Sequence, residues 1–223
     1  MERKLLIYDV DKTILDSSYP LYYWWLEIAK EFNTTFFESK EHYDYIIQKY
    51  DWKWMDFARE EFWLHKNHHN KIIKIWKRNI KRLYDEHAKP YEWYKEIFDK
   101  LRKEWYIIAI ATNNVKEVVI NSIKHILWDD VIIHSETSHP EKIKPEPDML
   151  LDIINELGFD RKDVLMIWDE EWDLVAATRA WVLAVLANYD STLCPLVHSN
   201  NYDYIINKPE QIFEILEELK NVA

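Results

Sequence analysis

The chain has 223 residues, of which 48% are hydrophobic and 31% are charged, and its formal net charge is -11. This length is sufficient for one large domain or for a core with an inserted module. A protein that binds nucleic acid mainly by neutralising phosphates is normally basic, so the acidic balance argues against nucleic acid as a partner. An anionic phosphate substrate is still allowed, because a metal ion and a few cations can hold it locally.

A single cysteine, Cys194, excludes a disulfide within the chain and is consistent with a reducing cytoplasm. The first residues contain only a short apolar run followed by charges, which fits neither a signal peptide nor a membrane span. No later stretch is long and apolar enough to cross a bilayer. We therefore expect a cytoplasmic protein without a membrane partner, present as a monomer or a homodimer.

The first predicted element is the apolar run Lys4–Tyr8, which is followed by acidic residues and is typical of a buried parallel strand. From about Ser17 to Ala88 the pattern is helical and rich in aromatic residues. Within this segment, Lys71–Tyr84 has apolar residues at helical spacing and a stripe of lysine and arginine on the opposite face. The stripe is typical of a solvated helix face. We predict an α-helical cap over residues 17–88.

After Pro90, predicted strands alternate with predicted helices, which indicates βαβ units and a parallel sheet covered on both faces. The predicted strands are Tyr106–Ala111, Val131–His134, Val164–Ile167, Val182–Leu186 and Tyr204–Ile206. The predicted helices are Trp93–Lys103, Val115–Leu127, Pro147–Leu157, Glu171–Ala180 and Glu210–Lys220. We therefore predict an α/β fold with a Rossmann-like parallel sheet core, formed by residues 1–16 and 89–223 and interrupted by the all-α segment.

Polar side chains follow four of the predicted strands, at the points where the strands end. Ligands of open α/β sheets bind beyond the carboxyl ends of the strands, so we expect these side chains to share one edge. They are Asp9, Asp11, Thr13, Asp16, Thr112, Asn113, Asn114, Lys144, Asp169, Glu170, Glu171 and Asp173.

The acidic members of this set predict a metal site and a nucleophile. A carboxylate cluster with few counter-charges requires a hard cation, and Mg2+ takes oxygen ligands, for which Asp9 and Asp169 are the natural candidates. A carboxylate such as Asp9 can also attack phosphorus and form an acyl-phosphate. Asp11 lies two residues further on, so it can protonate the leaving oxygen of the same ester.

Three other residues of the set suit the phosphate group itself. The Thr112 hydroxyl and the Asn113 backbone N–H can hold phosphate oxygens. Lys144 can neutralise charge on the phosphoryl group and on the attacking carboxylate. Together these residue types predict phosphate chemistry on a small phosphorylated metabolite, with Mg2+ as the cofactor.

Four segments resemble the motifs of the haloacid dehalogenase superfamily. YDVDKTILDS (Tyr8–Ser17) is similar to the first motif, and IATNN (Ile110–Asn114) is similar to the second. KPEPD (Lys144–Asp148) resembles the third motif, and WDEEWD (Trp168–Asp173) resembles the fourth. The motifs occur in the family's order, and the predicted helical segment stands where the family has its helical cap. The chain is thus similar to the helical-cap phosphatases that resemble phosphoglycolate phosphatase.

The resemblance implies roles for individual residues. It implies that Asp9 is the nucleophile and a metal ligand, and that Asp11 is the acid/base with its carbonyl on the metal. It implies that Lys144 serves the nucleophile and the phosphate, with Lys142 as the second candidate for that position. The residues implied for phosphate are Thr112 and Asn113, and those implied for the metal site are Asp169 and Asp173 as well as Asp9 and Asp11.

Asp11 also bears on the reaction, because the family's true dehalogenases lack an acid at this position. The resemblance therefore favours a phosphoric monoester hydrolase with an aspartyl-phosphate intermediate. A phosphotransferase of the same fold, such as a sugar-phosphate mutase, and a catalytically impaired binding protein are the alternatives. Two residues depart from the family pattern: Lys12 stands where many members have Gly, and Glu170, where Ser or Thr is usual, adds negative charge near the metal.

The chain contains 12 tryptophans and one glycine, Gly158, although glycine averages about 7% of residues. Helices often end in a left-handed residue, usually glycine, and several tryptophans follow predicted helices. One hypothesis is that their codons are UGA, which some bacteria read as glycine; an altered chain and ordinary core aromatics are the alternatives. The tryptophans at glycine-like positions are Trp93, Trp105, Trp128, Trp168 and Trp181.

Overall fold

A computed structural model of the chain describes residues 4–34, 37–49, 60, 64, 66–137, 139, 141–189 and 201–222. Cys194 lies outside these ranges. The chain divides into two compact units, one formed by Met1–Asp16 with Pro90–Ala223 and the other by Ser17–Lys89. The first unit is α/β, and the described elements of the second are helical, apart from Lys89 at its end, which belongs to a two-residue strand. None of the described helices is long and apolar enough to span a bilayer.

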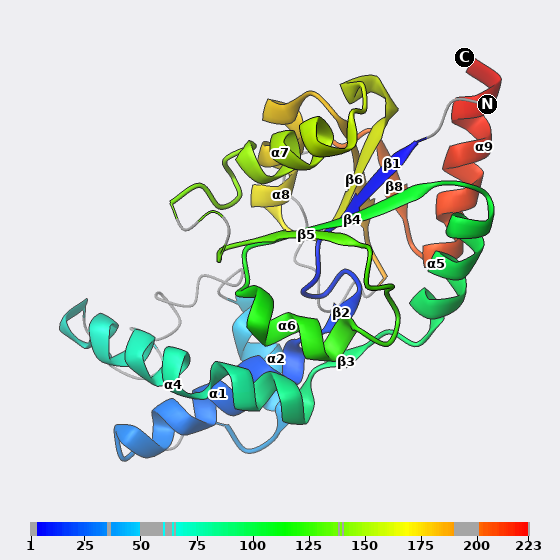
Figure 1. Ribbon diagram of the computed structural model, residues 1–223. Coiled ribbons are helices and arrows are strands. Elements are labelled where there is room, and N and C mark those ends of the chain that lie inside the picture. Colours follow the sequence, from blue (N-terminus) through cyan, green and yellow to red (C-terminus); the bar gives the residue numbers. More distant parts are fainter. Residues whose placement is uncertain are drawn as a thin grey trace. The chain divides into compact units, whose positions relative to one another are not determined.

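The α/β unit is built on a six-stranded parallel sheet with the order β5-β4-β1-β6-β7-β8 (Figure 1). In the register, Leu5 of β1 lies opposite Ile107 of β4 and Val164 of β6, so these three strands end close together. This sheet confirms the predicted α/β class. Its strands are β1 (Leu5–Tyr8), β4 (Ile107–Thr112), β5 (Ile132–Ser135), β6 (Val164–Trp168), β7 (Leu183–Ala187) and β8 (Tyr204–Ile206).

Helices cover both faces of the sheet. In Figure 1, α7 and α8 lie on one side of the strands, and α5 and α9 lie on the other. Leu5 and Ile7 belong to the core on the side of α7 and α8, whereas the Tyr8 ring packs 5.1 Å from the Phe98 ring of α5, measured between centroids. Because β1 is buried on both faces, its sequence is continuously apolar. The helices are α5 (Trp93–Lys103), α6 (Lys116–Ile123), α7 (Asp148–Leu157), α8 (Glu171–Ala180) and α9 (Ile212–Val222).

Some short elements differ from the sequence-based prediction. The two-residue strands β2 (Leu15–Asp16) and β3 (Lys89–Pro90) form a second small sheet, and a pair this short has no periodic signal. Helix α6 ends at Ile123, four residues before the predicted end, and a 3-10 turn over Pro209–Gln211 delays the start of α9. Another 3-10 turn, Arg161–Asp163, precedes β6.

The described part of the unit Ser17–Lys89 contains α1 (Ser18–Glu31), α2 (Lys40–Lys49), the 3-10 turn Lys66–His68 and α4 (His69–His87). The core of this unit includes Trp24, Trp25, Ile28, Ile72, Ile75 and Leu83. The basic stripe of α4 is exposed and forms ion pairs, for example Arg78 with Glu31 of α1 at 2.8 Å. The stripe is thus a solvated face, as predicted.

Two of the five tryptophans adopt the backbone conformation that favours glycine. Trp105 has φ 69° and Trp181 has φ 59°, close to the φ of 69° at Gly158. The two residues are 72% and 79% exposed, so neither contributes a buried indole. A left-handed residue with a side chain costs roughly 1–2 kcal/mol, which glycine avoids.

The other three tryptophans differ from this pattern. Trp128 does not have a positive φ, because α6 ends at Ile123 and Trp128 therefore does not terminate it. Trp93 begins α5, and its ring stacks on Tyr91 with centroids 5.0 Å apart. Trp168 is fully buried in β6, in the core beneath α7 and α8.

Candidate active site

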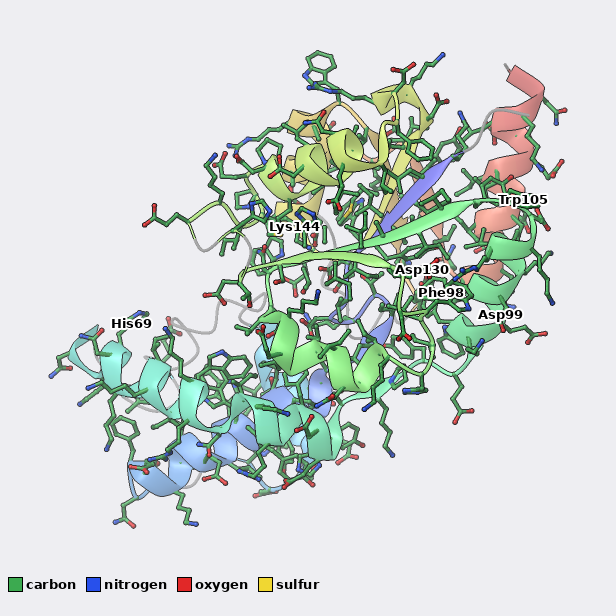
Figure 2. The ribbon with its side chains drawn as sticks, in the orientation of Figure 1. His69, Phe98, Asp99, Trp105, Asp130 and Lys144 are labelled. Atoms are coloured by element: carbon green, nitrogen blue, oxygen red, sulfur yellow. The ribbon has the colours of Figure 1, made fainter. Side chains whose placement is uncertain are left out.

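Lys144 is the central cation of the site. It lies in the segment between β5 and α7 (Figure 2), and its buried ammonium contacts the carboxylates of both Asp9 and Asp173. It also donates a 2.9 Å hydrogen bond to the Ala111 carbonyl at the end of β4. Burial lowers the pKa of Lys144, but the Asp173 and Asp9 carboxylates raise it by more, so the amine stays protonated.

Three buried carboxylates meet beside this ammonium. One oxygen each from Asp9, Asp169 and Asp173 lies within 4.8 Å of the others. The first two follow neighbouring parallel strands, β1 and β6, and Asp173 lies in the first turn of α8. Burial raises the pKa of Asp9 to about 8, against the lowering effect of Lys144. Burial also raises the pKa values of Asp169 and Asp173.

The first motif also contacts Asp169. The Thr13 hydroxyl donates a 3.0 Å hydrogen bond to Asp169 Oδ1. Next to it, the Lys12 ammonium donates a 2.5 Å hydrogen bond to Glu170. The two residues that depart from the family pattern thus pair with each other, which compensates the extra charge of Glu170. Lys12 has φ 57°, the conformation that explains why glycine suits this position.

Asp11 is not one of the three clustered carboxylates, but it lies near enough to Asp9 that its charge raises the pKa of Asp9. It is half-buried, and Asn114 donates a 3.1 Å hydrogen bond from Nδ2 to Asp11 Oδ2. Asn114 in turn accepts a 2.8 Å hydrogen bond on Oδ1 from the Val115 N–H, which orients its amide. The sequence assigned no role to Asn114; its place two residues after the end of β4 was the available signal.

The residues predicted to bind phosphate lie at the end of β4. The buried Thr112 hydroxyl accepts a 3.1 Å hydrogen bond from the Asn114 N–H. The Asn113 side chain donates to the Lys144 carbonyl and accepts from the Lys144 N–H, both at 2.8 Å. Asn113 therefore positions the lysine, a function that the sequence did not reveal. Phosphate binding by these two residues stays a prediction.

The structure also separates the two candidate lysines. Lys142 is 64% exposed and pairs with Asp148 at 2.6 Å, away from Asp9. Lys144, in contrast, is buried against the carboxylates. Lys144 is therefore the amine that reaches the strand ends.

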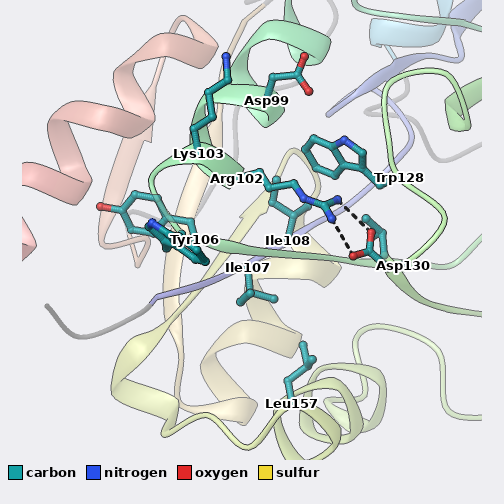
Figure 3. A pocket seen from close by; sticks show the side chains of 11 residues that line it. Asp99, Arg102, Lys103, Tyr106, Ile107, Ile108, Trp128, Asp130 and Leu157 are labelled. Atoms are coloured by element: carbon teal, nitrogen blue, oxygen red, sulfur yellow. Dashed lines mark hydrogen bonds and ion pairs between the residues drawn. The ribbon is translucent and has the colours of Figure 1, made fainter.

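A cavity of about 750 Å³ lies elsewhere in the α/β unit (Figure 3). It lies at the start of β4 and the end of α5, and Trp105, one of its lining residues, is well separated from Lys144 in Figure 2. Arg102 crosses it above the Trp128 ring to pair with Asp130 at 2.9 Å. None of the clustered carboxylates lines it.

The sequence profile of the haloacid dehalogenase-like hydrolases matches residues 6–187, which includes all four motifs. The chain belongs to the haloacid dehalogenase-like hydrolases. The match extends from β1 through β7, so it covers five of the six strands of the sheet and every residue of the carboxylate cluster. The resemblance inferred from the motifs is thereby confirmed, and the chain is a hydrolase by family.

Individual relatives of this hydrolase share only modest sequence identity with it. A protein from Caldanaerobacter subterraneus, provisionally named pyrophosphatase PpaX, is 27% identical over 149 residues, which are 66% of this chain and 67% of the relative. Pyrophosphatase PpaX from Halalkalibacterium halodurans is 22% identical, over 65% and 68% of the two chains. Among solved structures, a haloacid dehalogenase-like family hydrolase from Streptococcus pneumoniae has a TM-score of 0.74 at 16% identity, covering 96% of this chain and 98% of its own.

Proposed function

We propose that the chain is a Mg2+-dependent phosphatase that hydrolyses a phosphate monoester of a small metabolite, with Asp9 as the nucleophile. The observation that carries this proposal is the buried Lys144 ammonium between the Asp9 and Asp173 carboxylates, with Asp169 beside them. A nucleophilic carboxylate, a fixed cation and a divalent-metal site are what phosphoryl transfer to an enzyme requires.

The residues present fit a hard divalent cation. Asp9, Asp169 and Asp173 offer only oxygen ligands, as Mg2+ prefers. Both carboxylate oxygens of Asp173 are buried and make no hydrogen bond of ordinary geometry to the described residues, although Lys144 contacts one of them. We propose that Asp9, Asp169 and the Asp11 carbonyl hold the ion, with Asp173 in support. The bound ion would neutralise charge on the phosphoryl oxygens.

The chain's own residues can perform the first step. An Asp9 carboxylate oxygen attacks phosphorus, so a P–O bond to Asp9 forms while the bond to the leaving oxygen breaks. Asp11 gives its proton to that oxygen, and the Asn114 amide holds the Asp11 carboxyl in place at 3.1 Å. Lys144 stabilises the negative charge on the transferred group. The products are an alcohol and an aspartyl-phosphate.

The same groups can complete the cycle. Asp11, now a carboxylate, takes a proton from water, and the hydroxyl attacks phosphorus as the bond to Asp9 breaks. Inorganic phosphate leaves, and both carboxyl groups return to their initial states. Thr112 and the Asn113 backbone N–H are proposed to hold the phosphate oxygens throughout. The helices of Ser17–Lys89 are proposed to act as the specificity-determining cap.

A second candidate is the hydrolysis of pyrophosphate. The curated relatives bear the name pyrophosphatase, which favours a phosphoanhydride as the bond that is cleaved. The catalytic residues would be the same, with phosphate in place of an alcohol as the leaving group. The phosphotransferase alternative also keeps Asp9 but passes the phosphoryl group to another hydroxyl.

One assay separates these candidates. The full chain is incubated with a panel of small phosphate monoesters and with pyrophosphate, with Mg2+ or with a chelator. Released phosphate and organic products are measured by phosphorus NMR. Mg2+-dependent phosphate release, faster from a monoester than from pyrophosphate, is the expected result. Faster cleavage of pyrophosphate would support the second candidate, and an isomerised phosphate ester would support a mutase. No turnover of any compound would contradict the proposed phosphatase.

A further inference from the structure

A second group of potential metal ligands lies at the edge of the sheet, outside the carboxylate cluster. His134 is near the end of the edge strand β5, His139 follows it in the segment before α7, and Asp152 lies on α7. Figure 1 shows α7 beside β5. One ligand atom from each of the three residues lies within 4.8 Å of the others. We propose that His134, His139 and Asp152 bind a transition-metal dication of the Zn2+ class.

The hydrogen-bonding state of His134 leaves one ring nitrogen available. Its Nε2 lies 3.2 Å from Glu156 Oε2, and an ionised carboxylate can only accept, so Nε2 carries the proton. In the neutral ring, Nδ1 then keeps its lone pair and points toward His139. Metal-bound histidines commonly donate their other N–H to a carboxylate in this way, which fixes the tautomer and the ring orientation.

The Nε2 atom of His139 lies near two other potential ligand atoms, one from His134 and one from Asp152. Its Nε2 is 2.9 Å from His134 Nδ1 and 3.7 Å from Asp152 Oδ2. A single N–H on this atom cannot satisfy both neighbours. A cation between the three atoms can take the two lone pairs and the carboxylate oxygen together. Bonds of about 2.0–2.1 Å in a tetrahedral zinc site place ligand atoms about 3.3 Å apart, and the two measured distances bracket this value.

The ligand types select the metal. Imidazole nitrogen suits Zn2+, Ni2+, Co2+ and Cu2+, whereas Mg2+ and Ca2+ prefer oxygen. The two histidine side chains are largely buried, but the Asp152 side chain is 56% exposed, so an ion can enter from solvent and keep water as its remaining ligand. This site is therefore chemically distinct from the all-carboxylate cluster.

The position of the site has a structural consequence. His139 belongs to the same connecting segment as Lys144, and Asp152 belongs to the helix that this segment enters. A bound ion would join β5, the connecting segment and α7 at one point. Because the ion binds only the folded arrangement, it would raise the melting temperature of the chain. This inference does not depend on the proposed phosphatase activity.

Zinc binding by the full chain tests the proposal. Zn2+ is titrated calorimetrically in a large excess of Mg2+, so that the carboxylate cluster is occupied, and imidazole nitrogens are followed by NMR. We expect one Zn2+ per chain, with ring shifts at His134 and His139. The exposed His125 supplies the control, since His125→Asn should bind Zn2+ as the unsubstituted chain does.

Substitutions of the proposed ligands and of Glu156 show which results would overturn the zinc proposal. His134→Asn with His139→Asn should lose this Zn2+, and Glu156→Gln should weaken binding about 10- to 100-fold, as the loss of an outer partner does. Asp152→Asn, at an exposed position, tests the site even if the histidine variant does not fold. Absence of Zn2+ binding in the unsubstituted chain, or undiminished binding in Asp152→Asn, would overturn the proposal.

Discussion

The side-chain amide of Asn113 holds the peptide of Lys144 through two hydrogen bonds of 2.8 Å each, although 31 residues separate them in the sequence. One bond uses the amide as donor and the other uses it as acceptor, so the amide can make both in a single orientation only. This pair fixes the backbone from which the Lys144 ammonium reaches Asp9. It connects the second and third motifs directly.

The variant Asn113→Ala should lower kcat about 10- to 100-fold, because the reacting groups tolerate little misplacement. The measurement is steady-state phosphate release in Mg2+ on the best substrate of the panel. Combining Asn113→Ala with Lys144→Ala provides the control for a positioning role. If Asn113 acts through the lysine, the double variant should be no slower than Lys144→Ala alone. Additive losses would contradict this role.

Asp9→Asn should abolish phosphate release, by about 10³-fold or more, while the fold is retained. The amide keeps the shape of the carboxylate but cannot attack phosphorus. Folding should persist because Lys144 keeps its contact with Asp173 and its 2.9 Å bond to the Ala111 carbonyl. Circular dichroism and thermal melting check the fold, and phosphate release checks the chemistry. Normal turnover would remove Asp9 from the nucleophile role.

Asp11→Asn should slow turnover most for esters with poor leaving groups, by about 10²- to 10⁴-fold. An alkoxide needs a proton as it leaves, whereas a nitrophenolate leaves readily without one. The comparison is kcat/KM for an alkyl phosphate and an aryl phosphate, on both the variant and the unsubstituted chain. Equal slowing of the two esters would argue against proton donation by Asp11.

Trp181→Gly should raise the free energy of unfolding by about 1 kcal/mol, and Trp105→Gly should act in the same direction. Glycine relieves roughly 1–2 kcal/mol of left-handed strain, and the greater freedom of the unfolded chain offsets about 0.4–1 kcal/mol of this gain. The measurement is urea denaturation monitored by circular dichroism.

Two controls isolate the backbone effect. Trp181→Ala removes the exposed indole but keeps the strain, so it should not stabilise the chain. Gly158→Ala should destabilise it by about 1 kcal/mol, which is the left-handed strain less the entropy that alanine removes from the unfolded chain; steric overlap adds nothing, because an added Cβ at this position meets no atom within 4 Å. A gain for Trp181→Ala equal to that for Trp181→Gly would contradict the strain explanation.

Trp168→Gly should instead lower the free energy of unfolding, by about 3–5 kcal/mol, because it leaves a cavity at a fully buried position in the core. Trp168→Phe should cost much less. It keeps most of the packing and removes an indole N–H that is buried without a hydrogen bond to the described residues. Urea denaturation measures both changes. A gain in stability for Trp168→Gly would show that the core closes without the indole, as the glycine-codon hypothesis predicts.

Much of the architecture could be predicted because its causes are local. Helix α5 and strand β8 have the predicted bounds, since a helical period and a short apolar run leave direct traces in sequence. The left-handed backbone at Trp105 and Trp181 was also predictable, because helix termination depends on the residues at the helix end. The expectation for Trp128 was wrong, because α6 ends earlier than its apolar pattern predicts.

The sequence by itself determined the α/β class, the family and the acids and amine placed after parallel strands. Only the tertiary structure decided which of these groups are in contact. Lys144, rather than Lys142, contacts the Asp9 carboxylate. Asn113 forms hydrogen bonds with the Lys144 backbone, and Asn114 donates a hydrogen bond to Asp11. The reason is that strand order and loop path bring together atoms from distant segments, and these contacts leave no periodic trace in the chain. The grouping of His134 with His139 and a helix carboxylate is decided in the same way.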